Sequence, residues 1–162
     1  MDPYSTHLFL TALALNKTGQ LFPELPIVEC GCGDYSSPLI AALRNGRDYV
    51  IYSSDPEWSK RYELFADVRH VLIAEKKRWV YPDIKDGWGL CLMDSEESVV
   101  NRATHIPDLI EKCKVVVMHD AREDVIPKAK YQHMLVRYRP WTWIGSNEVD
   151  VGEWMQETFY EM

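Results

Sequence analysis

Five short apolar runs recur along this chain, and most of them are followed by a turn and a segment with helical spacing. They cover residues 26–30, 48–52, 70–74, 88–93 and 114–118. Strands that are apolar at nearly every position are typical of parallel sheets covered on both faces, whereas half-exposed strands alternate. The pattern predicts an α/β fold with a doubly wound, mostly parallel, Rossmann-like sheet and helices on both faces.

Cap and turn residues mark the helices between these runs. Serine, threonine or aspartate before a helix, proline in its first turn and glycine past its end favour three early helices, over residues 5–15, 37–43 and 55–66. We expect Ser5 or Thr6 to cap the first helix, residues 17–19 to end it, and Ser37 to cap the second.

The second half of the chain has weaker helix signals. Residues 95–105 lack helical spacing and Pro107 is unsuited to a helix interior, so we expect a long loop and then a short helix over 108–113. Residues 134–138 and 141–144 predict two final strands, which places an antiparallel strand near the C-terminus.

Composition narrows the function classes. The 162 residues carry 18 Lys and Arg against 25 Asp and Glu, a net charge of −7 that disfavours nucleic acid as a partner. The apolar stretch over 8–15 is too short to span a membrane, and four cysteines without a Cys-x-x-Cys pair favour reduced thiols. We expect a single domain over residues 1–162 in a cytoplasmic protein with no membrane partner. Tryptophans, where exposed, can mark a homodimer face.

Parallel sheets bind ligands beyond the carboxyl ends of their strands, where the winding reverses. The predicted strand ends carry polar or glycine residues, namely Glu29 with Gly31 and Gly33, Ser53 with Asp55, Asp94, and His119 with Asp120. We therefore expect these side chains to share one site.

The first strand ends in Glu29-Cys-Gly31-Cys-Gly33. Gly31 permits a tight turn, and Gly33 lets a ligand approach the backbone closely. A dinucleotide site would have a third glycine, but Ser36 stands there, and a carboxylate at Glu29 suits a cationic ammonium group better than a pyrophosphate. Both cysteines are interpreted as small residues packed at the turn, in preference to a metal or redox pair.

This turn resembles the first motif of class I S-adenosylmethionine-dependent methyltransferases, an acid, any residue, glycine, any residue and glycine. The longer stretch 28–38 is similar to the version found in small members of that family, and the resemblance runs from about residue 6 to 150. Its further features are residues 55–58, Asp94, Arg102 and 116–121.

The resemblance implies a methyltransferase-like fold that binds S-adenosylmethionine and releases S-adenosylhomocysteine. Glu29, Gly31, Gly33 and Ser36 would hold the methionine part, and Asp94 would also contact the cofactor. An acid normally follows the second strand to hold the ribose; here Ser53 occupies that position and Asp55 is the nearest carboxylate. Glu75, Trp79 or Trp88 would flank the adenine.

Each site residue also has a plainer interpretation. Asp55 precedes Pro56, so it can be an ordinary helix cap, a ribose ligand or both. His119 is the candidate acid/base with Asp94 beside it, and it can equally be a structural histidine. Asp94 and Asp120 can together hold Mg²⁺, but we disfavour a metal here and expect Asp94 to line the substrate side.

The function expected from these observations is methyl transfer to a small molecule or an exposed side chain. One alternative is a catalytically degenerate protein of the same fold that serves in binding or assembly. A second alternative is a Rossmann-type enzyme that uses NAD or another nucleotide.

Overall fold

The computed structural model describes residues 7–62, 67–73, 86–95, 99–126, 128–136 and 139–160. Its helices are α1 (Leu8–Leu21), α2 (Ser36–Leu43), α3 (Pro56–Tyr62), α4 (Val99–Lys112) and α5 (Val151–Tyr160). Its strands are β1 (Ile27–Cys30), β2 (Tyr49–Ser53), β3 (Val68–Leu72), β4 (Trp88–Met93), β5 (Cys113–Ala121), β6 (Tyr131–Leu135) and β7 (Trp141–Ser146). None of the helices in these ranges is both long and apolar enough to span a membrane.

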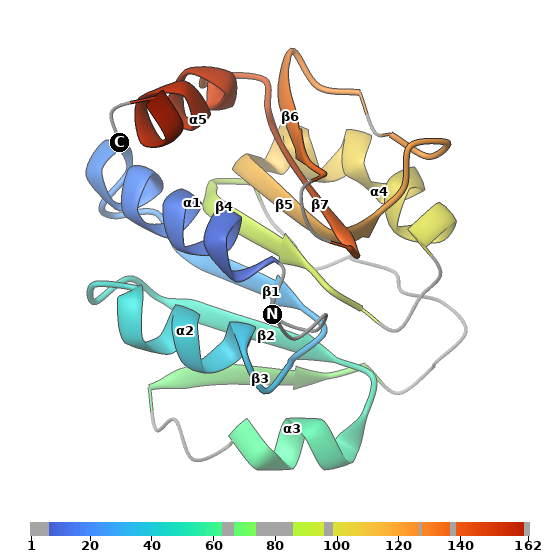
Figure 1. Ribbon diagram of the computed structural model, residues 1–162. Helices are drawn as coiled ribbons and strands as arrows, with labels where there is room; N and C mark the ends of the chain where they lie inside the picture. The colour runs from blue at the N-terminus through green and yellow to red at the C-terminus, as the bar shows by residue number, and fades with distance from the viewer. Residues whose placement is uncertain are drawn as a thin grey trace.

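The strands form one seven-stranded sheet in the order β3-β2-β1-β4-β5-β7-β6. Neighbours from β3 through β5 are parallel, whereas β7 runs antiparallel to both β5 and β6. The predicted doubly wound sheet is therefore confirmed, together with its antiparallel strand near the C-terminus. The winding reverses between β1 and β4, which lie side by side in the middle of the sheet (Figure 1).

Helices cover both faces of the sheet, as predicted (Figure 1). On one face α1, α2 and α5 pack on strand side chains that include Ile27, Ile51 and Leu92. On the other face α4 packs on alternate residues of the same strands, such as Val28 and Val116. All residues of β1, β2 and β4 are buried, because these strands have neighbours on both edges and side chains packed on both faces.

The third strand differs from its prediction. We expected a buried strand over 70–74, but β3 spans Val68–Leu72 and its residues are half-buried or exposed. The physical reason is its place at the edge of the sheet, where it pairs with β2 alone among the described strands.

The first helix is longer than predicted, because it continues through residues 17–19 to Leu21. Gly19 lies inside it, and a side chain there would approach the Arg47 guanidinium, whose nitrogens donate to the Leu15 carbonyl and the Thr18 hydroxyl at 3.0 Å. Arg47 thus fastens this end of α1 to the chain before β2. The expected caps Ser5 and Thr6 lie outside the described residues, and His7 stands at the N-cap without a side-chain cap bond.

Two helices in the second half also correct the sequence prediction. The loop expected over 95–105 is wrong from residue 99 onward, because α4 is continuous through Pro107. Burial of Ile106, Leu109 and Ile110 against the sheet outweighs the hydrogen bond that proline removes. The sequence prediction also missed α5, which Asp150 caps by accepting hydrogen bonds from the amides of Gly152 and Glu153 at 2.9 and 3.1 Å.

Candidate functional site

The glycine turn after β1 lies at the point where the sheet reverses its winding. Gly31 has a φ of +89°, and a Cβ atom there would overlap the backbone carbonyl of Asp94. The main chains of the β1 and β4 ends are thereby in direct contact, as the amide of Asp94 also donates to the Cys30 carbonyl at 2.8 Å. Only glycine fits this close approach.

Glu29 lies beneath the turn and is fully buried. Its Oε2 accepts hydrogen bonds from the Tyr49 hydroxyl and from the Ser37 hydroxyl, the latter at 2.8 Å. The Ser37 oxygen in turn accepts from the Gly33 amide at 3.1 Å. Ser37 is therefore no N-cap, a position held by Tyr35, and links Glu29 to the turn instead.

Burial raises the pKa of Glu29 from its usual 4.5 to about 7, although the nearby hydroxyls of Ser36, Tyr49 and Ser37 act in the opposite direction. Its other oxygen, Oε1, is buried without a hydrogen-bond partner among the described residues. Glu29 does not line either of the two cavities described in the next paragraph. The expected contact of its carboxylate with an ammonium group therefore stays a prediction.

Two adjoining cavities follow the carboxyl edge of the sheet. The larger, of about 640 Å³, is lined by Gly33, Ser36, Asp94 and His119 among others. The smaller, of about 200 Å³, is lined by Gly31, Ser53, Asp55 and Asp94. Cys32, Trp58 and Asp94 belong to both linings. The structure thus brings the predicted site residues together along one edge, with Glu29 beneath them.

The end of β5 presents two adjacent side chains to the larger cavity. Successive side chains on a regular strand point to opposite faces. Here Asp120 has a φ of 57°, and the pairing of β5 with β7 shifts register between Met118 and Ala121. This bulge re-aims the strand end, so that His119 and Asp120 both line the cavity.

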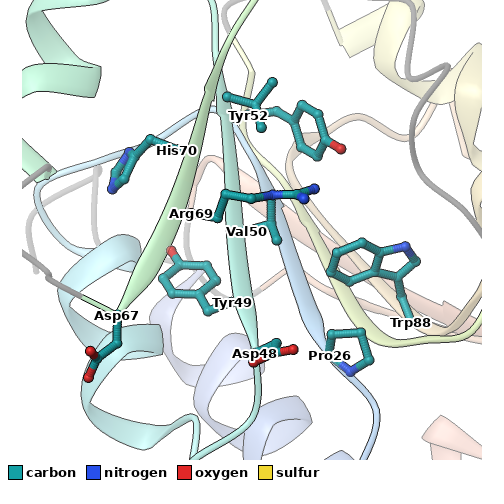
Figure 2. Close-up of a pocket in the computed structure, with 10 residues that line it drawn as sticks. Pro26, Asp48, Tyr49, Val50, Tyr52, Asp67, Arg69, His70 and Trp88 are labelled. Carbon is teal, nitrogen blue, oxygen red and sulfur yellow. The ribbon is translucent and has the colours of Figure 1, made fainter.

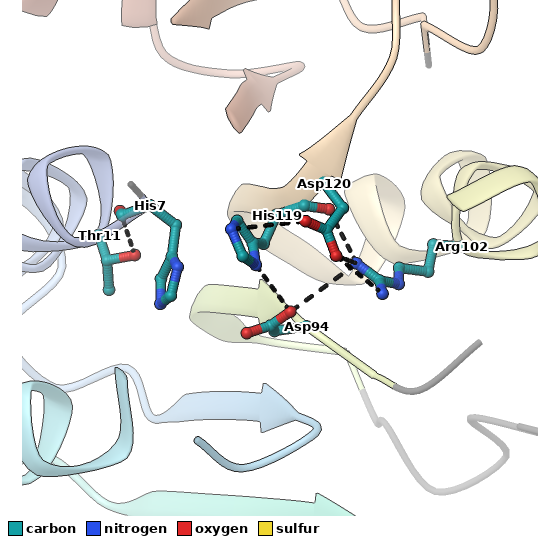
Figure 3. A network of polar contacts seen from close by, with 6 residues as sticks. All are labelled: His7, Thr11, Asp94, Arg102, His119 and Asp120. Atoms are coloured by element: carbon teal, nitrogen blue, oxygen red, sulfur yellow. Dashed lines mark hydrogen bonds and ion pairs between the residues drawn. The ribbon is translucent and has the colours of Figure 1, made fainter. Parts of the chain in front are cut away.

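A polar network joins the ends of β4, β5 and α4 (Figure 3). His119 Nδ1 lies 2.9 Å from Asp94 Oδ1, and His119 Nε2 lies 3.6 Å from Asp120 Oδ1. Because a carboxylate only accepts hydrogen bonds, Nδ1 of the neutral ring carries the hydrogen and Nε2 is the acceptor nitrogen. A base oriented by a carboxylate in this way is suited to proton transfer.

Arg102, a residue of α4 that is only 6% exposed, is the fourth member of the network. Its Nη1 donates to the His119 carbonyl oxygen at 2.9 Å, and both terminal nitrogens lie 3.3 Å from Asp120 Oδ2. Nη1 is also 3.8 Å from Asp94 Oδ1. Burial would raise the pKa of Asp94, but the hydrogen bond and charge of His119, with His7 and Arg102, hold it below its usual value.

His7 is the site residue that the sequence prediction missed. It precedes α1, lines the larger cavity, and its ring centroid lies 4.2 Å from that of His119. Burial, together with the nearby His119, lowers the pKa of His7 from 6.5 to about 4. The available signal was topological, since a helix that leads into the first parallel strand runs antiparallel to it and begins at the carboxyl edge.

Asp55 is a helix cap. Its Oδ1 accepts from the amides of Glu57 and Trp58 at 2.8 and 3.4 Å at the start of α3. The plainer interpretation is therefore confirmed, and a ribose contact stays a prediction because Asp55 also faces the smaller cavity. Ser53, at the expected ribose position, bonds the backbone of Asp55 at 3.1 and 3.2 Å.

Another cavity, of about 860 Å³, extends along β2 and β3, from Asp48 and Asp67 to Tyr52 and Val71 (Figure 2). Trp88 lines it at the amino end of β4, so the prediction that Trp88 flanks an adenine beside Asp94 is wrong: the two residues stand at opposite ends of the strand. Glu75 and Trp79 lie outside the described residues. Parallel sheets place ligands at the carboxyl edge, which favours the cavities around Asp94 over this one.

The comparisons with known proteins agree with the strand order. No family model matches the chain, and neither does any curated protein. Among solved structures, the bifunctional kinase-methyltransferase WbdD matches with a TM-score of 0.67 at 12% identity, over 91% of this chain and 40% of that one. The METTL16 methyltransferase domain matches with a TM-score of 0.58 at 14% identity, over 92% and 70%. At this identity the similarity is one of fold, and the chain has the class I methyltransferase fold.

Proposed function

We propose that this chain is an S-adenosylmethionine-dependent methyltransferase that acts on a small molecule or an exposed side chain. The observation that carries the proposal is the position of Asp94 between two adjoining cavities. Its backbone lies against Gly31, which lines the smaller cavity, and its carboxylate is paired with His119, which lines the larger one. The fold supports the same function, because ligands of wound sheets bind at this reversal point.

The chain's residues fit the methyl donor at its methionine end. Gly33 lines the larger cavity without a side chain, and the buried, unpaired oxygen of Glu29 lies beneath the turn. The carboxylate of Asp55 faces the smaller cavity, where it would hold ribose hydroxyls while it caps α3. When bound, S-adenosylmethionine supplies a methyl group already activated on a sulfonium.

The acceptor side is built by His119, Asp94 and Arg102. His119 Nε2 is placed to take the proton that an acceptor hydroxyl or amine loses, while Asp94 holds Nδ1 and stabilises the charged ring. Arg102 fixes the backbone of His119 and the carboxylate of Asp120. A cavity of about 640 Å³ admits the reactive end of a donor together with a small acceptor or a single side chain.

Calorimetry with S-adenosylhomocysteine tests the donor site. Gly33→Val fills the larger cavity without a backbone clash, because its Cβ would meet only the Ser36 hydroxyl at 3.3 Å, and it should reduce the affinity at least tenfold. Gly19→Ala is the matched control: it lies in α1, away from the cavities, and should leave binding unchanged. Gly31 is unsuitable for this test because any side chain there collides with the fold.

Two results would refute the proposal. One is a folded wild-type protein that does not bind S-adenosylhomocysteine, and the other is binding that Gly33→Val leaves unchanged. Binding of NAD in its place would favour a nucleotide-dependent enzyme. Absence of binding by both ligands would favour a binding or assembly role.

A further inference from the structure

Two histidines and an aspartate meet at the larger cavity, each from a different element. His7 comes from the start of α1, Asp94 from the end of β4 and His119 from β5 (Figure 3). One ligand atom of each residue lies within 4.8 Å of the others. Neutral imidazole nitrogen and carboxylate oxygen are both metal ligands.

The ring of His7 is the observation that points to a ligand. His7 is 2% exposed, and neither of its ring nitrogens has a hydrogen-bond partner among the described residues. A buried polar group without a hydrogen-bond partner destabilises the folded protein, so such groups call for an explanation. His7 lines the larger cavity, and Figure 3 shows its ring beside His119 and Asp94.

We propose that His7, Asp94 and His119 bind a divalent transition-metal ion. Two histidines and one carboxylate on one side of an ion form a recognised set for zinc and for iron(II), with further positions left open. Asp94 Oδ1 and His119 Nδ1 are 2.9 Å apart, which matches the roughly 3.0 Å between two ligand atoms at right angles around an ion about 2.1 Å away. The ion takes the place of the hydrogen between them, that hydrogen moves to Nε2 of His119, and His7 moves inward to complete the set. A metal-bound His119 therefore cannot also be the base, so the two states are alternatives.

The ligand types and charges at the site favour a transition-metal ion such as Zn²⁺ over a hard cation such as Mg²⁺. Arg102 is closest to Asp120 and to the His119 carbonyl, so its charge is largely balanced by Asp120 and leaves Asp94 as the ligand carboxylate. Mg²⁺ prefers oxygen ligands and keeps its water, whereas imidazole suits zinc and iron. The open positions face the cavity, where an acceptor oxygen would bind. Metal binding itself needs no methyl donor, although it uses His119 and Asp94, to which the proposed function assigns proton transfer.

The experiment uses the full chain after treatment with a chelator. Zn²⁺ is titrated by calorimetry and Co²⁺ by visible absorption, and each should bind with one equivalent, while Mg²⁺ should not bind. His7→Gln and His119→Gln should each weaken Zn²⁺ binding at least tenfold. The matched control is His70→Gln, since His70 also has two buried ring nitrogens without a partner among the described residues, but lines the cavity shown in Figure 2. It should bind Zn²⁺ as the wild type does.

Circular dichroism identifies variants that fold, and two separate ligand variants keep the test decisive if one of them does not. Lack of stoichiometric Zn²⁺ binding by the folded wild type would overturn the proposal. So would unchanged binding in a folded His7→Gln, or an equal loss in His70→Gln. S-adenosylhomocysteine binding measured on the same metal-free samples separates failure of this proposal from failure of the methyl-donor site.

Discussion

Glu29→Gln should change how the free energy of unfolding depends on pH. Glu29 is fully buried, and its pKa rises from 4.5 to about 7 on folding. The folded protein therefore binds the proton more tightly than the unfolded chain. The stability that this group contributes is fully present below pH 4.5 and is lost as pH rises through about 7. A shift of this size corresponds to about 3 kcal/mol across that window.

The titration of His7 changes the free energy of unfolding in the opposite direction. A plot of that free energy against pH for the wild type therefore conceals the effect of Glu29. The pKa of His7 falls from 6.5 to about 4 on folding, and its stability contribution is present above pH 6.5 and lost as pH falls through about 4. The two contributions largely offset each other where their windows overlap. Glu29→Gln removes the titrating carboxyl and leaves His7 in place, so the difference between the two curves isolates Glu29.

The assay is urea unfolding of wild type and Glu29→Gln from about pH 5 to about pH 8. Between about pH 5 and about pH 8, the free energy of unfolding of Glu29→Gln should rise by about 2 to 3 kcal/mol relative to that of wild type, because only the wild type must ionise a buried acid. Tyr49→Phe keeps the acid but removes a hydrogen bond that lowers the pKa of Glu29, so the free energy of unfolding of this variant should depend on pH at least as strongly as that of wild type. Parallel curves for wild type and Glu29→Gln would refute the reasoning.

Substitutions at three further positions test the contacts that hold the site together. Gly31→Ala should lower the free energy of unfolding in urea by about 4 kcal/mol or more, because its φ is +89° and its Cβ overlaps the Asp94 backbone; a loss under about 1 kcal/mol would contradict this. Asp55→Ala should cost about 1 kcal/mol in thermal unfolding through the lost α3 cap, while Asp55→Asn keeps the cap, so a tenfold loss of S-adenosylhomocysteine affinity in Asp55→Asn would identify a ribose contact. Arg102→Met should lower the free energy of unfolding in urea by about 2 kcal/mol. This is less than the loss expected for a fully buried ion pair, because the Asp120 side chain is 40% exposed. An unchanged urea midpoint would contradict a stabilising role for the Arg102–Asp120 pair.

The fold was predictable where the sequence pattern and the burial agree. β1, β2, β4 and β5 were recognised as strands because packing on both faces makes them apolar at most positions. β3 was recognised as a strand, but its apolar run overstated its burial, since an edge position is a property of the whole sheet. α4 was mostly missed because Pro107 is a local signal, whereas the packing that holds the helix together depends on the sheet beneath it.

The candidate site was predictable to the extent that topology alone positions it. Gly31, Asp94 and His119 meet because parallel strands end at one edge. Asp120 was expected at this edge, whereas His7 and the bulge that turns Asp120 toward the cavity escaped the prediction, because the first is a single histidine outside any periodic pattern and the second has no mark in the sequence. Both depend on contacts between segments far apart in the chain.

Asp94 serves the two halves of the site through different atoms. Its backbone carbonyl lies against Gly31 on the proposed donor side, while its carboxylate contacts His119 and Arg102 on the proposed acceptor side. A change of its side chain therefore leaves the Gly31 contact in place, whereas a change at Gly31 displaces the backbone that carries the carboxylate. It follows that the donor side can be kept while the acceptor side is altered at Asp94, but that a disturbed glycine turn alters both halves.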